Sequence, residues 1–187
     1  FFITICAASV SGGMEVIMKN QNKTRGIVIL ALFIAMSVIG GYIKLPNPIT
    51  SSIAFDSLPA YLAALLLGGA PGAIVGFLGH IISAALGGFS LTLPVHLLVA
   101  SEMALIMFIF SFCAKKINIV AAIIAGILLN GVIMPATLIL IPGFGVPVFL
   151  AMLLPLTAAS TLNILVCTLI YKPINKAVFG ERKDIIK

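Results

Sequence analysis

Six long runs of apolar residues, separated by short polar, glycine-containing or proline-containing segments, make up most of this sequence. No run shows the strict alternation of apolar and polar residues that predicts a half-buried strand. A helix needs roughly 20 apolar residues to cross a bilayer, and it leaves no backbone group unpaired in lipid. The pattern therefore predicts an all-α membrane protein whose spans cover residues 26–43, 56–69, 71–88, 94–114, 117–141 and 147–172.

Local signals place some ends of these helices. Asp56 or Ser57 suits the N-cap of the second helix, and Pro59 suits its first turn. Pro155 falls inside the sixth run. We therefore expect that run to begin with a short re-entrant or broken piece and to span the membrane only after Pro155.

The composition agrees with this pattern. The chain has 187 residues, of which 61% are hydrophobic and 9% charged, whereas a soluble domain is about 45–50% apolar and about 25% charged. An ordinary water-soluble enzyme and a disordered chain are both excluded. We expect a single membrane domain over residues 18–187, preceded by a tag, leader or extension of unknown role at residues 1–17.

The positive charges predict the orientation, because Lys and Arg mark the cytoplasmic side of a membrane protein. With six spans, one side of the membrane holds all the basic residues except Lys44. We therefore expect both termini in the cytoplasm of a multi-pass protein of the cell membrane, and no nucleic-acid partner. The clusters precede the first run, follow the fourth and follow the sixth, at Lys19, Lys23, Arg25, Lys115, Lys116, Lys172, Lys176, Arg182, Lys183 and Lys187.

Polar groups at membrane depth are costly, so they usually face a cavity and serve a function. On the predicted spans they converge on the outer half of the protein. Glu102 has no cation at its depth, about 12 Å below the start of its span, so a cavity role is favoured. The candidates are Asp56, His80, His96, Glu102, Asn130 and Asn163.

Each candidate has a structural alternative. Asp56 either caps a helix or binds a ligand, and the two asparagines either join helices or bind a ligand. His96 either binds a ligand or contacts headgroups and water, while a structural role is favoured for His80. His96 and Glu102 are rotated about 240° apart on an ideal helix, so a narrow pocket does not receive both unless the helix start is irregular.

Aromatic residues flank the predicted outer loops and suit a flat ligand. Phe144 lies in a Gly/Pro segment, and Phe55 and Tyr61 flank the loop before the second span. The alternative is that they anchor the protein at the interface. Two acidic candidates without a cation disfavour an anionic substrate, so a neutral or cationic heteroaromatic compound with hydroxyls is expected.

Small residues form helix-packing ridges. Gly72 and Gly76 lie four residues apart, as do Ala31 and Ala35 in the first span, and both spacings allow close helix approach. The three cysteines show no metal-site spacing. No metal, cofactor or catalytic residue is expected, and without a phosphate-binding loop the chain cannot hydrolyse ATP alone.

These features together resemble the S component, the substrate-binding subunit, of energy-coupling factor (ECF) vitamin transporters. The likeness covers nearly all of residues 18–187 and includes the size, the six spans, the basic lead before Arg25 and the Ala31–Ala35 spacing. In that family this spacing docks on a transmembrane coupling subunit driven by two ATPases. The resemblance implies these partners, capture of a vitamin or precursor outside, and reorientation in the membrane to release it.

Family pockets use spans four to six, with the loop after span one as a lid, and Glu102, Asn130, Asn163 and residues 52–57 occupy matching places. The segment from Ser51 to Tyr61, with Gly79-His80 and Pro94-Val-His-Leu97, looks most like the branch for α-ribazole, a neutral benzimidazole riboside used in cobalamin salvage. Riboflavin and a queuosine precursor are the alternative substrates.

Two other classes compete with a binding subunit. An intramembrane hydrolase needs a nucleophile beside a base, and here Ser83 or Ser101 with His80 forms the only improvised pair. A channel needs a ring of polar residues, which a single copy of this chain lacks. We therefore expect a non-enzymatic binding protein.

Overall fold

The computed structural model describes residues 24–42, 44–45, 53–54 and 56–179. The chain divides into two compact units, residues 1–32 and residues 33–187. The described part of the first unit is the start of the helix Thr24–Gly40, and the rest of that helix belongs to the second unit. The expected extension at residues 1–17 and the aromatic Phe55 lie outside the described residues.

The described part of the second unit consists of helices, their connecting turns and one short hairpin. Two-residue strands β1 and β2 pair antiparallel, with Lys44 opposite Ala54. The sequence analysis does not predict this hairpin. In chain order the elements are β1 (Lys44–Leu45), β2 (Ile53–Ala54), α2 (Ser57–Leu66), α3 (Gly69–Leu86), α4 (Leu93–Lys116), α5 (Ile119–Leu128), the π-helix Leu129–Ile133, α6 (Met134–Thr137), the 3₁₀ helix Leu138–Leu140 and α7 (Gly145–Phe179).

Four helical segments in the described part are long and apolar enough to cross a membrane, namely Gly69–Leu86, Leu93–Lys116, Ile119–Leu140 and Gly145–Val178. This confirms a multi-helix membrane protein. The remaining two predicted spans are shorter, and α2 has 10 residues. At a rise of about 1.5 Å per residue, α2 covers roughly half of the ~30 Å hydrocarbon core. Six full-length spans are therefore not confirmed.

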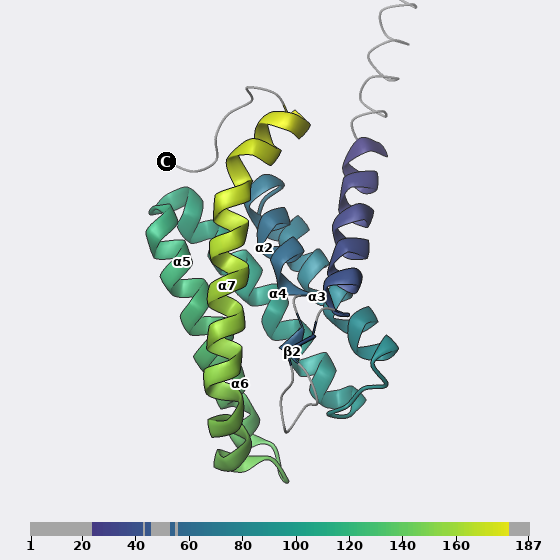
Figure 1. Cartoon of the computed structure of the whole chain (residues 1–187), viewed down its shortest axis with the longest axis vertical. Coiled ribbons are helices and arrows are strands. Elements are labelled where there is room, and N and C mark those ends of the chain that lie inside the picture. Colours follow the sequence, from purple (N-terminus) through teal and green to yellow (C-terminus); the bar gives the residue numbers. More distant parts are fainter. Residues whose placement is uncertain (1–23, 43, 46–52, 55, 180–187) are drawn as a thin grey trace, which may run out of the picture. The chain divides into compact units, whose positions relative to one another are not determined.

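The last helix is continuous, so the expected break before Pro155 is wrong. Both Pro155 and Pro173 lie inside the 35-residue α7. Each proline removes one backbone hydrogen bond, and membrane helices tolerate this loss because neighbouring groups satisfy the freed carbonyl. In Figure 1, α7 runs beside α5 and α6.

The half-length helix α2 forms the centre of the core. Its residues from Pro59 to Leu66 are all buried, and it packs against α3, α4 and α7. The glycine ridge of α3 permits this close packing. A Cβ on Gly72 would lie 2.5 Å from the Ala64 Cβ, and one on Gly76 would lie 3.1 Å from the Met107 side chain. The Gly72–Gly76 spacing therefore serves internal packing, as the sequence predicts.

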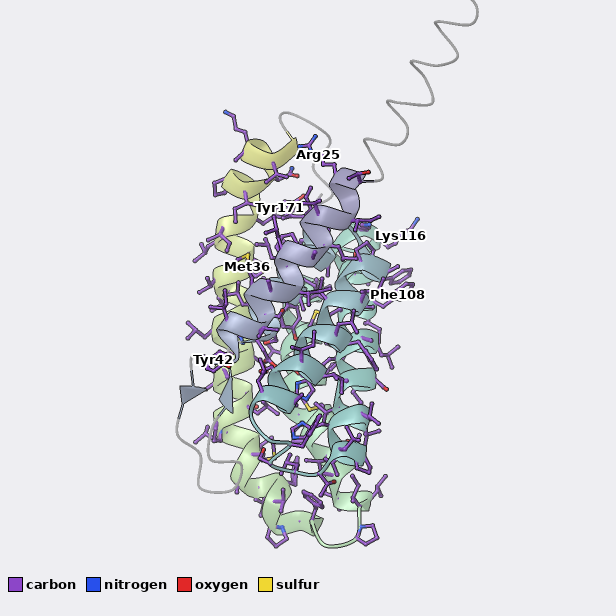
Figure 2. The ribbon with its side chains drawn as sticks, turned by 90° about the vertical axis from the view of Figure 1, so that its right-hand side faces the viewer. Arg25, Met36, Tyr42, Phe108, Lys116 and Tyr171 are labelled. Carbon is purple, nitrogen blue, oxygen red and sulfur yellow. The ribbon has the colours of Figure 1, made fainter. Side chains whose placement is uncertain are left out.

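Apolar side chains also cover the outside of the helices. Phe108 is 53% exposed and extends outward from α4, as Figure 2 shows. Leu154 on α7 is 78% exposed. Exposed leucine and phenylalanine at this density are typical of helices that face lipid.

Candidate functional site

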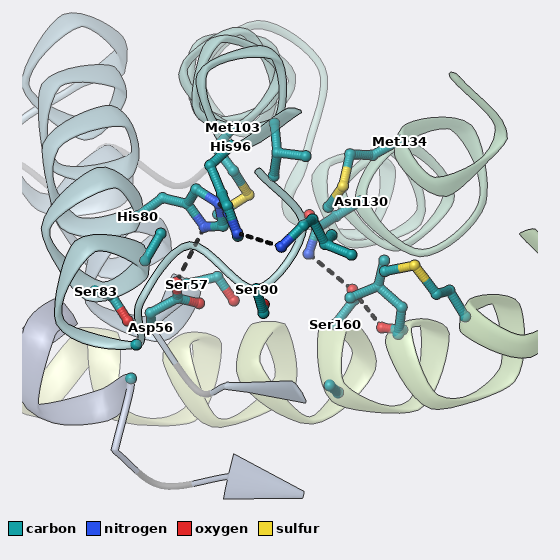
Figure 3. Close-up of a pocket in the computed structure, with 18 of the residues that line it drawn as sticks. Asp56, Ser57, His80, Ser83, Ser90, His96, Met103, Asn130, Met134 and Ser160 are labelled. Atoms are coloured by element: carbon teal, nitrogen blue, oxygen red, sulfur yellow. Dashed lines mark hydrogen bonds and ion pairs between the residues drawn. The ribbon is translucent and has the colours of Figure 1, made fainter. Parts of the chain in front are cut away.

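A partly enclosed cavity of about 250 Å³ lies within the second unit (Figure 3). Its walls come from the start of α2, from α3, the α3–α4 turn and α4, from the π-helix and α6, and from the first half of α7. Segments far apart in sequence therefore contribute to one space, which is the usual construction of a ligand site between helices.

The cavity lies far from the basic ends of its helices. His96 is in the first turn of α4, whereas Lys115 and Lys116 are in its last turn. On α7, Asn163 lines the cavity and Lys176 is in the last turn. A rise of about 1.5 Å per residue separates these groups by about 20–30 Å. The cavity and the lysines thus occupy opposite ends of α4 and α7.

One end of the cavity carries a chain of polar contacts. Asp56 Oδ2 lies 3.2 Å from His80 Nδ1, and His80 Nε2 lies 3.2 Å from His96 Nδ1. The backbone N–H of Leu91 donates to His96 Nε2 at 3.4 Å. Asp56 occupies the N-cap position of α2, but its side chain makes no capping hydrogen bond. Its carboxylate faces His80 instead.

The rotation of α4 decides which of its residues reach the cavity. His96, Val99 and Met103 line it, and their spacing of three and four residues places them on one helix face. Glu102 is not among the lining residues; it is half-buried beside Thr137, with Oε2 unpaired within the described structure. The structure therefore does not bring Glu102 to the cavity, in line with its angular separation from His96.

Two buried asparagines form a second polar group in the wall. Asn130 Nδ2 donates to Ser160 Oγ at 2.8 Å, and Ser160 Oγ donates to the Leu156 carbonyl at 2.7 Å. Asn163 Nδ2 donates to Ser57 Oγ at 2.7 Å and so links α7 to α2. Within the described structure, Oδ1 of both asparagines is buried without a hydrogen-bond partner. An unpaired buried acceptor is costly, which a ligand donor would relieve.

The π-helix positions Asn130. A π turn inserted in an α-helix often marks a functional site, and here it spans Leu129–Ile133. Thr157 Oγ1 donates to the Gly131 carbonyl at 3.1 Å, and a Cβ on Gly131 would lie 2.8 Å from Thr157 Cα. Glycine at this position therefore lets α7 approach the turn that carries Asn130.

The rest of the wall is apolar and rich in thioethers. Methionine side chains are adaptable and make favourable contacts with aromatic rings. The apolar lining includes Val99, Met103, Met134, Leu138, Met152 and Leu156.

The three aromatic residues predicted for the site lie elsewhere or outside the described structure. Tyr61 is fully buried in the core, edge-on to Phe110 with ring centroids 4.9 Å apart, and its hydroxyl donates to the Gly126 carbonyl at 3.4 Å. Phe144 lies in the loop before α7, beside a separate shallow hollow. Phe55 is not described. Tyr61 and Phe144 were assigned from their nearness to predicted loops, which does not determine where a side chain points.

The cavity also contains residues that the sequence analysis did not assign to it. His80 was given a structural role, and Ser160 was not considered. Ser160 lies three residues before Asn163, on the same face of its helix, and that spacing was an available signal. Depth along its span makes His80 a candidate, but no sequence signal indicates its partners, which lie 24 and 16 residues away.

Charge and chemistry limit what the cavity does. Among its lining residues, Asp56 carries the formal negative charge and there is no lysine or arginine. No group of three or more possible metal ligands occurs in the described ranges. Both ring nitrogens of His80 face Asp56 and His96, and Ser101 Oγ donates to the Leu97 carbonyl. Neither ring nitrogen of His80 is therefore available to activate Ser83 or Ser101, the nucleophiles of the hydrolase alternative.

Ala31 and Ala35 are one helical turn apart on Thr24–Gly40, and both are exposed. Larger apolar residues on the same helix are exposed too, with Leu32 at 58% and Met36 at 47%. Both alanines are thus small, exposed residues among larger exposed residues of this helix.

A family model for the ECF transporter substrate-specific component matches residues 25–175. Comparisons with curated proteins and with solved structures give no significant match. Because the matched segment covers most of the sequence, the chain belongs to the ECF transporter substrate-specific component family. It is a multi-pass membrane protein of substrate uptake, and a small-molecule substrate and an ECF module are its partners.

Proposed function

We propose that this S component captures a neutral, heteroaromatic, hydroxyl-bearing cofactor precursor in the cavity between α2, α3, α4 and α7. The observation that carries the proposal is the two-part wall. One end holds Asp56, the histidines and serines, and the other holds methionine and leucine side chains. A ligand with a flat aromatic part and a polar sugar part would satisfy both ends.

Charge and size narrow the substrate. The described lining residues include Asp56 and no lysine or arginine, which disfavours an anion. The volume of about 250 Å³ lies below the ~300 Å³ at which ligand pockets usually begin. A nucleoside-sized ligand therefore fits better than the larger riboflavin. We propose α-ribazole as the substrate, with riboflavin and a queuosine precursor as the alternatives.

Asp56, Asn130 and Asn163 are the proposed hydrogen-bonding residues, and the ring of His96 lines the same cavity. Asp56 would accept a hydrogen bond from a ligand hydroxyl, and the two asparagines would accept hydrogen bonds through their unpaired Oδ1 atoms. Glu102, Phe144, Phe55 and Tyr61 are not needed for this arrangement.

We also propose that the cavity opens toward the exterior and that both termini lie in the cytoplasm of the cell that bears this membrane. The lysines at the ends of α4 and α7 support this orientation, because they lie away from the cavity. In this topology the helix Thr24–Gly40 and the apolar run at residues 56–69 form the first two crossings.

Ala31 and Ala35, both exposed on the helix Thr24–Gly40, are the proposed docking residues for the transmembrane coupling subunit, which two ATPases drive. Ala35→Leu places a larger side chain at one of these positions, so it should abolish co-purification with the ECF module and uptake, while substrate binding stays intact. Met36→Leu is the control, because Met36 is an exposed neighbour and leucine has about the same volume as methionine. Unchanged co-purification of Ala35→Leu would contradict the docking role.

The substrate is tested by calorimetry on detergent-purified protein with α-ribazole, riboflavin and queuine. We expect saturable binding of α-ribazole, with a rise in Tm because a bound ligand stabilises the folded state. Binding of another compound in preference to α-ribazole would overturn the substrate assignment. Turnover of any ligand would favour a hydrolase.

A further inference from the structure

The hydrogen bonds that link Asp56, His80 and His96 run in one direction, which the backbone N–H of Leu91 determines. The N–H of Leu91 donates to His96 Nε2, so this nitrogen is an acceptor and carries no proton. A neutral His96 then carries its proton on Nδ1, which faces His80 Nε2 at 3.2 Å. His96 therefore donates to His80.

The same reasoning extends to Asp56. Because His80 Nε2 accepts a hydrogen bond, a neutral His80 carries its proton on Nδ1. That nitrogen lies 3.2 Å from Asp56 Oδ2, so His80 donates to the carboxylate. The N–H group of each neutral imidazole therefore donates within this series of hydrogen bonds, and Asp56 remains an acceptor.

We infer that His80 and His96 are positioning residues that hold Asp56 as an anionic acceptor, so that this end of the cavity selects ligands that bring hydroxyl or N–H donors. The inference rests on the proposed binding function of the cavity. It also predicts discrimination against a phosphorylated or carboxylated form of the same ligand, since the described lining residues include no lysine or arginine.

An added proton breaks this series of hydrogen bonds at a defined contact. The titratable groups that line the cavity are Asp56, His80 and His96. A second proton on His80 opposes its Nε2–H to the Nδ1–H of His96, and a proton on His96 Nε2 opposes the Leu91 N–H. The first outcome weakens the contact between His80 and His96, and the second weakens the link to the α3–α4 turn, where Phe89 and Thr92 hold positive φ angles of 48° and 90°.

The hydrogen-bond direction is testable without a ligand, because the sequence contains only two histidines. In ¹⁵N-histidine NMR of the purified protein at neutral pH, we expect both rings to be neutral with the proton on Nδ1. A proton on Nε2 of either ring, or an imidazolium, would overturn the inference.

A variant separates this role from simple packing. His80→Asn retains an amide donor for Asp56 but removes the acceptor that faces His96 Nδ1. We expect His96 to keep the Nδ1–H tautomer in the folded variant, as judged by its Tm, because the Leu91 N–H still donates to its Nε2. A shift of His96 to the Nε2–H tautomer in a folded His80→Asn protein would contradict the proposed direction.

Selectivity is measured by calorimetry with α-ribazole and its 5′-phosphate. We expect the phosphate to bind about 100-fold more weakly, because like charges in an interface are strongly unfavourable. Equal affinities would overturn the inference. If α-ribazole binds but the tautomers differ, the inference fails and the proposed function stands. If the tautomers are as expected and neither compound binds, the proposed substrate fails and the hydrogen-bond direction stands.

Discussion

The same helices build two regions of opposite character. The packed region surrounds Tyr61 and includes Phe110, Gly72 and Gly126, where side chains fill the space and glycines bring helices together. The hollow region surrounds Asn130 and includes the Asp56 end of the cavity. Small residues on α3 and α5 close one region, whereas the π-helix and the polar pairs leave the other open. Stability and ligand affinity should therefore respond to substitutions in different places.

Gly72→Ala should have the largest effect on stability. Its Cβ would lie 2.5 Å from the Ala64 Cβ and 2.7 Å from the Ala64 Cα, so α2 and α3 must separate. Overpacking of this kind costs about 1–3 kcal/mol, which lowers Tm by about 2–4 °C per kcal/mol. Thermal unfolding in detergent is the measurement. Gly26→Ala, where a Cβ would meet no atom of another segment within 4 Å, is the control and should not lower Tm.

Asn130→Ala should have the largest effect on affinity among the polar residues of the hollow region. It removes the proposed ligand acceptor and the donor to Ser160. A loss of about 1.4 kcal/mol of binding free energy weakens binding about tenfold. Calorimetry with α-ribazole would show this change. Asn118→Ala removes the α5 N-cap, whose side chain accepts from the Ala121 N–H. This control should lower Tm without changing affinity, and equal affinity losses in both variants would contradict the prediction.

Tyr61→Phe should lower stability slightly and leave affinity unchanged. The buried hydroxyl donates to the Gly126 carbonyl, and its loss leaves that acceptor with one interaction fewer. A buried hydrogen bond contributes about 0.5–1.5 kcal/mol. Tm and affinity are measured on the same preparation. A clear affinity loss would mean that Tyr61 acts in the cavity, as its nearness to a loop first suggested.

Glu102→Gln should have the smallest effect. The side chain lies beside Thr137 and outside the cavity lining, so the affinity for α-ribazole should stay within about twofold of the wild type, a change of roughly 0.4 kcal/mol. An affinity loss as large as that of Asn130→Ala would show that the carboxylate reaches the ligand.

The sequence predicts the helices better than it predicts the cavity. The apolar run at residues 94–114 matches α4, since length and hydropathy are properties of a single segment. Depth along a span correctly selected Asn130 and Asn163 as cavity-wall residues, but it also selected Glu102, because depth says nothing about rotation around the helix. His80 was underestimated because its role depends on residues from two other segments. The continuity of α7 through Pro155 likewise depends on its surroundings.

The most direct test of the account is to fill the hollow region. Ala159 lines the cavity on α7 and is 3% exposed, whereas Leu162, about one turn away on the same helix, is 49% exposed. Calorimetry with α-ribazole on Ala159→Phe and Leu162→Phe, with Tm confirming that both fold, compares the two faces. The account predicts no detectable binding to Ala159→Phe and wild-type binding to Leu162→Phe. Wild-type binding to a folded Ala159→Phe protein would contradict it.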